Sequence, residues 1–148
     1  MRRNGEFGDG DRMSKHIETV QSIYAAFGRG DGPAVLAHIS EDVNWEYQYV
    51  TPSVPWLTPK RTRAGVGEFL QSTATELEFH AFVPKHFLAT GNIVVALCDV
   101  NCTVVKTGKK IIETDEPHIW HFDDRGKVIK FRHAADTHQQ FLAFTAQG

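Results

Sequence analysis

The first third of the chain carries apolar residues at helical spacing. Residues 14–27 place five of them on one side of a helix. These residues are Ile17, Val20, Ile23, Tyr24 and Phe27. Ser14 can cap the start of this helix, and Gly28 stands where a left-handed stop is favoured. The pattern therefore predicts an amphipathic helix over residues 14–27.

Two further helices and a first strand follow. The triplet Asp31-Gly32-Pro33 predicts a short second helix over residues 31–39, with proline at an early position. Val43, Trp45 and Tyr47 alternate with polar residues and predict a strand. Residues 50–62 are rich in proline and read as a loop, and a second apolar stripe predicts a helix over residues 63–77.

The rest of the chain reads as long strands joined by short turns. Strands are expected over residues 79–88, 93–105, 110–122 and 128–135. The turns contain glycine where a positive φ is needed, and such short connections make neighbouring strands antiparallel. A last helical turn is expected over residues 139–146, with Asp136 as its cap.

Early helices followed by an antiparallel meander indicate the α+β class. Long strands must curl, so we expect a cone-shaped curved antiparallel sheet covered by the N-terminal helices. Such a sheet encloses a concave pocket. The chain has 148 residues and 41% hydrophobic residues, which suits one domain with a sizeable core. Residues 1–12 are polar and are expected to form a disordered tail, with the domain over residues 13–148.

Charge and composition exclude several classes of partner. The net charge is −2, whereas a nucleic-acid-binding domain normally carries a basic face. The sequence has no apolar run long enough for a membrane span, and its start has no secretory signal. Cys98 and Cys102 would lie roughly 13 Å apart along a strand, too far for a disulfide. Free thiols suit a cytoplasmic location.

Signatures of cofactor and metal binding are not found. The sequence contains eight histidines, but none forms an HExxH motif. It also lacks a P-loop, a GxGxxG turn and a serine nucleophile elbow. We therefore expect no cofactor and no metal.

The strand over residues 93–105 has one entirely apolar face. That face consists of Val94, Ala96, Cys98, Val100, Cys102 and Val104. We expect it to lie away from the helices and to pack on a second copy of the sheet, which predicts a homodimer. Asp99 and Asn101 would then face the pocket, where a carboxylate needs a partner or a shifted pKa.

Two histidines and a tryptophan are candidates for the same pocket. His133 shares a strand face with apolar residues, and imidazole is suited to proton transfer near neutral pH. His118 and Trp120 share a face that we expect to be inward, although Pro117 could shift the register. A histidine that is only satisfied within the core, and a tryptophan that only packs, remain the alternatives.

Aromatic residues near the first strand complete the candidate site. Trp45 and Tyr47 would share its inward face, and the Tyr47 hydroxyl could orient a ligand. Trp56 in the proline-rich loop could cover the pocket. Plain aromatic packing and loop anchoring are the alternatives.

These segments resemble the SnoaL-like branch of the NTF2-like superfamily, a cystatin-like α+β barrel. The similar stretches are VQSIYAAFGRGD, ISEDVNWEY, VPWL, TGKK and HIWHFDDRGKVIKFRHAADT. The resemblance implies a fold shared by isomerases such as ketosteroid isomerase, polyketide cyclases, epoxide hydrolases and non-catalytic binding proteins. The position of the ketosteroid isomerase base matches Tyr47. Those of the limonene-epoxide hydrolase site match Asp99, Asn101 and His133, so neither set of charges is preserved.

The sequence thus supports one main hypothesis and two alternatives. The main hypothesis is an isomerase, cyclase or hydrolase acting on a small apolar organic molecule, with Asp99 and His133 as an acid–base pair. Tyr47 and His118 would orient the substrate. The alternatives are a non-catalytic ligand-binding domain and a structural dimer with a vestigial pocket.

Overall fold

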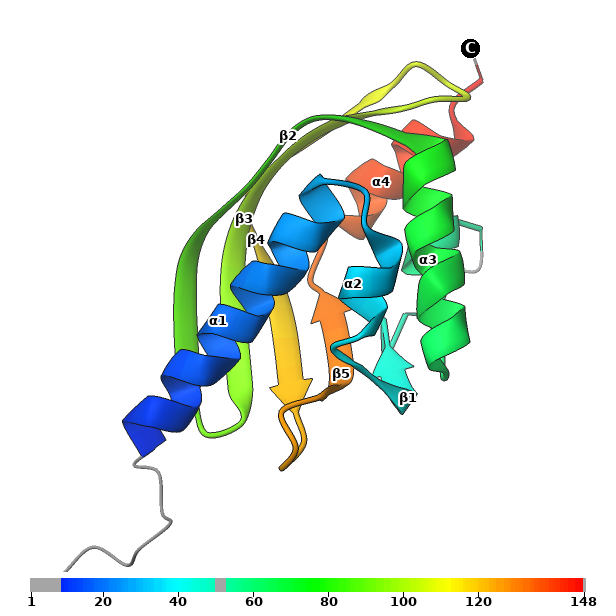
Figure 1. The fold of residues 1–148 in the computed structure, drawn as a ribbon. Coiled ribbons are helices and arrows are strands. Elements are labelled where there is room, and N and C mark those ends of the chain that lie inside the picture. Colours follow the sequence, from blue (N-terminus) through cyan, green and yellow to red (C-terminus); the bar gives the residue numbers. More distant parts are fainter. Residues whose placement is uncertain (1–8, 50–52, 148) are drawn as a thin grey trace, which may run out of the picture.

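The computed structural model describes residues 9–49 and 53–147 (Figure 1). The helices are α1 (Asp9–Gly28), α2 (Gly32–Leu36), α3 (Arg63–Glu76) and α4 (Thr137–Thr145), with a 3-10 turn η1 (Pro55–Leu57). The strands are β1 (Ile39–Trp45), β2 (Leu77–Thr90), β3 (Ile93–Val104), β4 (Lys110–Phe122) and β5 (Val128–His133). This order confirms the α+β class.

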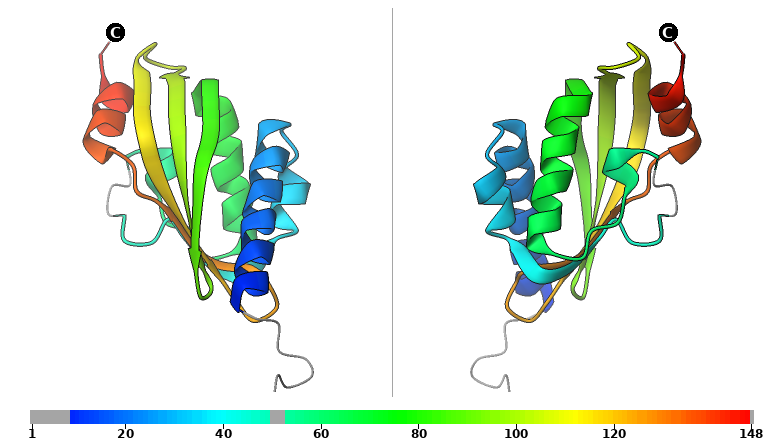
Figure 2. Two further views of the ribbon diagram at one scale, coloured as in Figure 1. Left: turned by 90° about the vertical axis from the view of Figure 1, so that its left-hand side faces the viewer. Right: turned by 90° about the vertical axis from the view of Figure 1, so that its right-hand side faces the viewer.

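The five strands form one curved sheet in the order β1-β5-β4-β3-β2. Strands β2 to β5 pair antiparallel, as their short turns require, whereas β1 pairs parallel with β5. Helices α1, α2 and α3 lie together on the concave side, and Figure 2 shows the sheet bending around them. The core and the candidate site lie between these helices and the sheet.

Side-chain caps fix the starts of three helices. Asp31 accepts a hydrogen bond from the Ala34 amide at the start of α2, 3.1 Å away. Thr62 caps α3 in the same way. Asp136 accepts a bond from the Gln139 amide at 3.0 Å, which confirms the predicted cap of α4. No helix in residues 9–49 and 53–147 is both long enough and apolar enough to span a membrane.

The first helix begins earlier than expected. It starts at Asp9, not at Ser14, so residues 9–12 belong to the helix and the predicted tail boundary was wrong there. Residues 1–8, the rest of the predicted tail, and residues 50–52 of the proline-rich loop lie outside the described residues. Strand β1 likewise starts at Ile39, inside the range predicted for the second helix.

The apolar face of β3 points toward the helices. Its residues are the buried positions of the strand, and Val100 and Cys102 border the cavity between sheet and helices. The prediction that this face lies away from the helices was therefore wrong, because α1 and α3 themselves need an apolar surface to cover. Asp99 and Asn101 consequently lie on the convex, outer face. Homodimerisation stays a prediction, without support from this strand.

Candidate functional site

A cavity of about 90 Å³ lies between the concave face of the sheet and helices α1 and α3. Most of its wall is apolar, and α1, α3, β2 and β4 contribute three or four residues each. The polar side chains that border it are Tyr24, Thr73, Glu116, His118, His133 and Gln140. An apolar pocket with a few converging polar groups is the usual form of a small-molecule site.

His133 and Glu46 form a buried pair at this wall. His133 is the last residue of β5, and its Nδ1 lies 2.6 Å from Glu46 Oε1. Both side chains are buried, and Glu46 is 0% exposed. Burial lowers the pKa of His133, but the carboxylate of Glu46 outweighs it and raises that pKa to about 9. Burial also raises the pKa of Glu46, against the opposing effect of His133.

A left-handed backbone conformation at Glu46 turns its own side chain inward. Strand β1 ends at Trp45, and Glu46 follows with φ of 56°. Its amide donates to the Phe131 carbonyl at 2.7 Å, which holds it against β5. Because φ is positive, the alternation of the strand stops, and Trp45 and Glu46 are both buried. A non-glycine residue in this region costs about 1 kcal/mol or more, which the surrounding contacts must offset.

The second nitrogen of His133 is available to a ligand. Nε2 has no hydrogen-bond partner within the described part of the chain, and the side chain borders the cavity. With a pKa of about 9, the ring is protonated at neutral pH and donates Nδ1–H to Glu46. Its Nε2–H is then a hydrogen-bond donor for whatever occupies the cavity.

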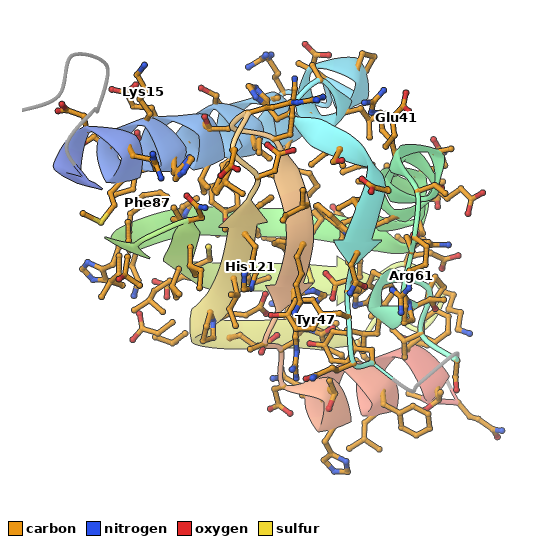
Figure 3. All side chains as sticks on the ribbon, turned by 90° about the horizontal axis from the view of Figure 1, so that it is seen from below. Lys15, Glu41, Tyr47, Arg61, Phe87 and His121 are labelled. Atoms are coloured by element: carbon orange, nitrogen blue, oxygen red, sulfur yellow. The ribbon has the colours of Figure 1, made fainter. Side chains whose placement is uncertain are left out.

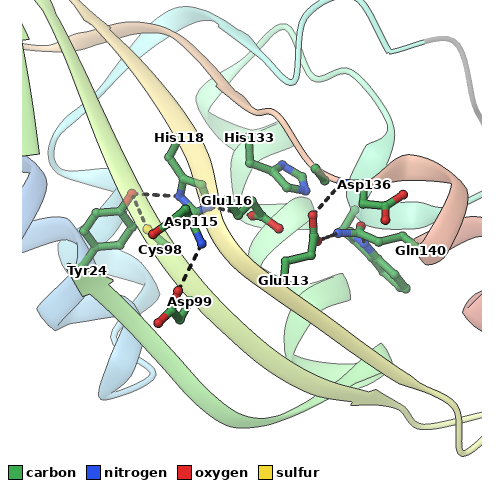
Figure 4. Close-up of polar contacts among 12 residues, drawn as sticks. Tyr24, Cys98, Asp99, Glu113, Asp115, Glu116, His118, His133, Asp136 and Gln140 are labelled. Carbon is green, nitrogen blue, oxygen red and sulfur yellow. Dashed lines mark hydrogen bonds and ion pairs between the residues drawn. The ribbon is translucent and has the colours of Figure 1, made fainter. Parts of the chain in front are cut away.

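His118 lies opposite His133 on the neighbouring strand but uses both ring nitrogens (Figure 4). Its Nδ1 lies 2.8 Å from the Tyr24 hydroxyl, and its Nε2 lies 2.7 Å from Glu116 Oε1. Tyr24 also accepts a hydrogen bond from Trp120 Nε1 at 3.1 Å. The partners are all satisfied when Tyr24 donates to Nδ1 and His118 donates Nε2–H to Glu116.

The ionisation states agree with this direction of donation. Burial, and then the positive charge of His133, lower the pKa of His118 well below its ordinary value. Burial raises the pKa of the Tyr24 phenol well above its ordinary value. His118 is therefore a neutral imidazole, and Tyr24 is a neutral donor.

Two glutamates of β4 reach the same side of the sheet. Glu113 accepts hydrogen bonds from the Asp136 amide at 2.5 Å and from Gln140 Nε2 at 2.6 Å. Burial, and then the neighbouring carboxylate of Glu116, raise the pKa of Glu113 to about 8. Glu113 therefore holds a proton at neutral pH beside Glu116.

Five of the residues predicted from the sequence border the cavity. They are Trp45, Trp56, His118, Trp120 and His133. Trp56 is buried by η1 and donates from Nε1 to Gln140 Oε1 at 2.7 Å. The inward face predicted for β4 is correct, because the register shift falls at residues 114–115 instead of at Pro117. Ligand binding by these five residues stays a prediction.

The predicted pairing of Asp99 with His133 was wrong. Asp99 lies on the outer face of β3, 39% exposed, with its carboxylate 2.8 Å from Lys85 Nζ. The hydrogen bond from Lys85 lowers the pKa of Asp99. Asn101 lies on the same outer face and does not border the cavity. The strand's alternation was right, but the side assigned to each face was reversed.

Tyr47 also lies outside the cavity. Figure 3 shows it beside His121, whose Nε2 is 3.4 Å from the Tyr47 hydroxyl. The Lys130 ammonium lies 4.3 Å from the centroid of its ring. The prediction that Tyr47 faces inward was wrong, because the left-handed Glu46 reverses the side on which the following residue falls.

Sequence reasoning missed Tyr24, Glu46, Glu113 and Gln140. A hydroxyl within the apolar stripe of the first helix was a usable signal for Tyr24, because a buried phenol needs a partner. The other three depend on tertiary features: Glu46 on its left-handed backbone, Glu113 on the bulge in β4, and Gln140 on the packing of α4 against the sheet. Across residues 9–49 and 53–147, no cluster of three or more His, Cys, Asp or Glu side chains could hold a metal ion.

Comparison with known families shows that the chain belongs to the SnoaL-like domain family, whose sequence model matches residues 20–131. An NTF2-like protein of Burkholderia pseudomallei is 29% identical, with a TM-score of 0.78 over 90% of this chain and 100% of that one. TerC, co-crystallised with polyporic acid, is 25% identical, with a TM-score of 0.76 over 89% of this chain and 99% of that one.

An LEH-like epoxide hydrolase of M. tuberculosis shares the fold at 16% identity, with a TM-score of 0.66 over 90% of this chain and 91% of that one. No curated protein matches the chain.

Proposed function

We propose that the cavity binds a small, mainly apolar organic molecule that carries an oxygen function, and that the protein moves a proton on it by general acid–base chemistry. The observation that carries this proposal is the buried Glu46–His133 pair: His133 borders the cavity, and its Nε2 has no hydrogen-bond partner among residues 9–49 and 53–147. A preorganised cation in an apolar site stabilises a developing oxyanion far better than water does.

Each wall of the cavity has a distinct part in this chemistry. His133 donates from Nε2 to a carbonyl oxygen, while it keeps its Nδ1 proton in the hydrogen bond to the Glu46 carboxylate, which balances the charge. The Glu116 carboxylate, held by His118, accepts a proton from the carbon next to that carbonyl. When the substrate has a carbon–carbon double bond at its β,γ position, the result is a dienol. Return of the proton from Glu116 to the γ-carbon, and of the hydroxyl proton to His133 Nε2, then gives the conjugated isomer. Atoms and charges balance without an external reactant.

The relatives support the ligand class. TerC was co-crystallised with a small organic acid, polyporic acid, and the apolar, aromatic wall of this cavity suits a small organic ligand as well. The epoxide hydrolase shares only the fold, so it leaves the reaction open among the isomerase, cyclase and hydrolase types expected from the sequence.

The test uses 4-nitrophenol, whose phenolate is coloured. Below the pKa of the free phenol, the wild-type protein should bind the probe as its phenolate, because the imidazolium of His133 stabilises that charge. His133→Gln should remove the coloured species, whereas His121→Gln, on the outer face, should leave it unchanged. If the probe does not bind, or if the folded His133→Gln variant keeps the phenolate signal, the proposal fails.

A further inference from the structure

Two glutamate carboxyl groups of β4 lie on the same side of the sheet. Glu116 pairs across the ladder with Cys98, and Glu113 pairs with Val100. Cys98 and Val100 both belong to the buried face of β3, so their partners in β4 share that face. The bulge makes this possible, because Glu113 and Glu116 are three positions apart and regular alternation would separate them. The two carboxyl groups therefore meet beside the cavity wall.

Both oxygens of Glu113 accept hydrogen bonds from the start of α4. Oε1 accepts from the Asp136 amide at 2.5 Å, and Oε2 accepts from Gln140 Nε2 at 2.6 Å. Gln140 in turn accepts from Trp56 Nε1 at 2.7 Å and is 4% exposed. These contacts hold the Glu113 carboxyl between α4 and β4, as drawn in Figure 4. Its position beside Glu116 is therefore fixed by the fold.

The two carboxyl groups are hydrogen-bonded to each other, which requires a proton between them. Two carboxyl groups in contact in a buried site do not both ionise, so the pair holds one proton and one negative charge. Glu113 can hold that proton without losing its bonds to α4, since a protonated oxygen keeps a lone pair. Glu116 then remains a carboxylate and accepts Nε2–H of His118 at 2.7 Å.

The two members of the pair are placed differently relative to the ligand. Glu116 borders the cavity and is 5% exposed. Glu113 is half-buried and lies behind Glu116, outside the cavity lining. Any effect of Glu113 on a ligand must therefore act through Glu116 and through the charge of the site.

The titratable groups that face Glu113 come from β3, β4, β5 and α4. They are Cys102, Glu116, His118, His133 and the capping residue Asp136.

The charges of these groups leave the site sensitive to Glu113. His133 is the cation, and Glu46 balances it. His118 is neutral, and burial raises the pKa of the Cys102 thiol to about 12, so it is neutral as well. Ionisation of Glu113 would therefore add a negative charge that nothing in this group offsets.

Asp136 does not change this balance. Its amide faces Glu113, whereas its carboxylate accepts hydrogen bonds from the backbone and side chain of Gln139.

We propose that Glu113 is a positioning residue that sets the charge of the site: it shares one proton with Glu116, and while the pair keeps that proton the cavity accepts an anionic oxygen beside His133. Loss of the proton places a second negative charge on the pair and opposes the anion. The inference rests on the proposed function for the position of that oxygen. It gives the site an upper pH limit that His133 alone would not set.

The order of ionisation gives the direction of the effect. Burial, and then Glu116, raise the pKa of Glu113 to about 8, whereas the pKa of His133 is about 9. As the pH rises, the pair therefore loses its proton before His133 loses its charge. By reciprocity, a bound anion must in turn raise the pKa of Glu113.

The first experiment follows the affinity for 4-nitrophenolate against pH, corrected at each pH for the phenolate fraction of the free probe. Between about pH 7.5 and pH 8.5, the neutral fraction of a group with a pKa of about 8 falls about threefold. The affinity of the wild-type protein should fall by a similar factor. In Glu113→Gln the fall should be less than about 1.5-fold, because only His133 still titrates nearby.

Glu68→Gln is the matched control for this experiment. The Glu68 carboxylate lies on the exposed surface of α3, where it pairs with Lys60. The same chemical substitution there should keep the wild-type pH profile.

The second experiment needs no substitution. Carboxyl ¹³C NMR of the wild-type protein should show the signals of Glu113 and Glu116 moving together in a common step near pH 8, since a shared proton belongs to the pair. Saturating 4-nitrophenol should move this step to higher pH.

The outcomes separate this inference from the proposed function. If 4-nitrophenol does not bind the wild-type protein, both fail. If it binds, but the folded Glu113→Gln variant keeps the wild-type fall in affinity or Glu68→Gln loses it equally, only this inference fails. The same holds if Glu113 titrates without Glu116, or if the bound probe leaves the common step unmoved.

Discussion

The two histidines that border the cavity lie side by side and are equally buried, but they differ in charge and in hydrogen bonding. His118 and His133 are cross-strand partners, their ring centroids are 5.9 Å apart, and both are buried. His133 is protonated and has one nitrogen free for a ligand. His118 is neutral, and both of its nitrogens are bonded to protein groups.

The difference lies in the partners and not in the burial. Burial lowers the pKa of both rings, and in His133 the fully buried Glu46 carboxylate reverses that effect. Once His133 is charged, a second positive charge 5.9 Å away is unfavourable, so His118 stays neutral. Two identical side chains thus become a cation for the ligand and a fixed link between Tyr24 and Glu116.

The largest change should come from removing the charge that keeps His133 protonated. Glu46→Gln removes the main counter-ion of the buried His133 ring, so its pKa should fall clearly from the wild-type value, with only the more distant Glu116 and Glu113 still acting against burial. Breaking a buried ion pair from one side costs about 3 kcal/mol or more. Urea denaturation and histidine NMR titration measure both effects. A pKa of His133 that stays near that of the wild-type protein would contradict the assigned cause.

Next in size is the pH dependence of stability. Because the folded-state pKa of His133 is raised to about 9, its contribution is complete below the unfolded value and is lost as the pH rises through 9. The shift corresponds to at most about 3 kcal/mol. Urea denaturation of the wild-type protein between pH 6 and 10 should show this loss, and His133→Gln should lack it. The same decline in both proteins would exclude His133 as its source.

His118 should affect the pH dependence of stability in the opposite direction. Its folded-state pKa is lowered. When the pH falls below the ordinary pKa of histidine, the unfolded chain therefore binds a proton at His118 and the folded protein does not. Stability should therefore fall as the pH decreases below about 6.5, and His118→Gln should reduce that acid-side slope. If the slope is unchanged in the variant, His118 is not neutral in the folded state.

Tyr24→Phe should have an intermediate effect and should act on the His118 side alone. The substitution leaves His118 Nδ1 without a donor and Trp120 Nε1 without an acceptor, which should cost about 2 kcal/mol. The pKa of His133 should move little, because Glu46 sets it. Thermal denaturation and the His133 NMR titration check the two statements, and a large shift at His133 would mean that the two sides are coupled.

The smallest effect is expected outside the cavity. Tyr47→Phe removes a long contact with His121 on the outer face and should change stability by less than about 0.5 kcal/mol. Binding of 4-nitrophenol should be unchanged. A clear loss of binding would restore the ligand-orienting role predicted from the sequence.

Much of the fold could be predicted because its signals are local. Helix stripes, caps at Asp31 and Asp136, and short glycine turns gave the order of elements and the antiparallel meander. The inward face of β4 also followed from its alternation, and His133 and His118 were identified as candidates. These features depend on neighbours within a few residues, where the sequence pattern is read directly.

The candidate site could be predicted only in part, because two positive-φ residues interrupt the alternation. Glu46 was passed over, since regular alternation put it outside with Tyr47 facing inward. Glu113 lies on the cavity side only because of the bulge at Asp115. Neither Glu46 nor Asp115, the two residues with positive φ, is a glycine, so nothing in the local sequence marks the break in alternation.

The sequence by itself therefore determined which residues alternate and which turns join them, because side-chain direction in a strand has a fixed period. It left open which face of β3 meets the helices, because a period assigns residues to two faces without saying what covers each. The tertiary structure decided this: α1 and α3 cover the apolar face, and Asp99 meets Lys85 outside. The charge of His133 was decided in the same way, since it depends on a carboxylate 87 residues away in the chain.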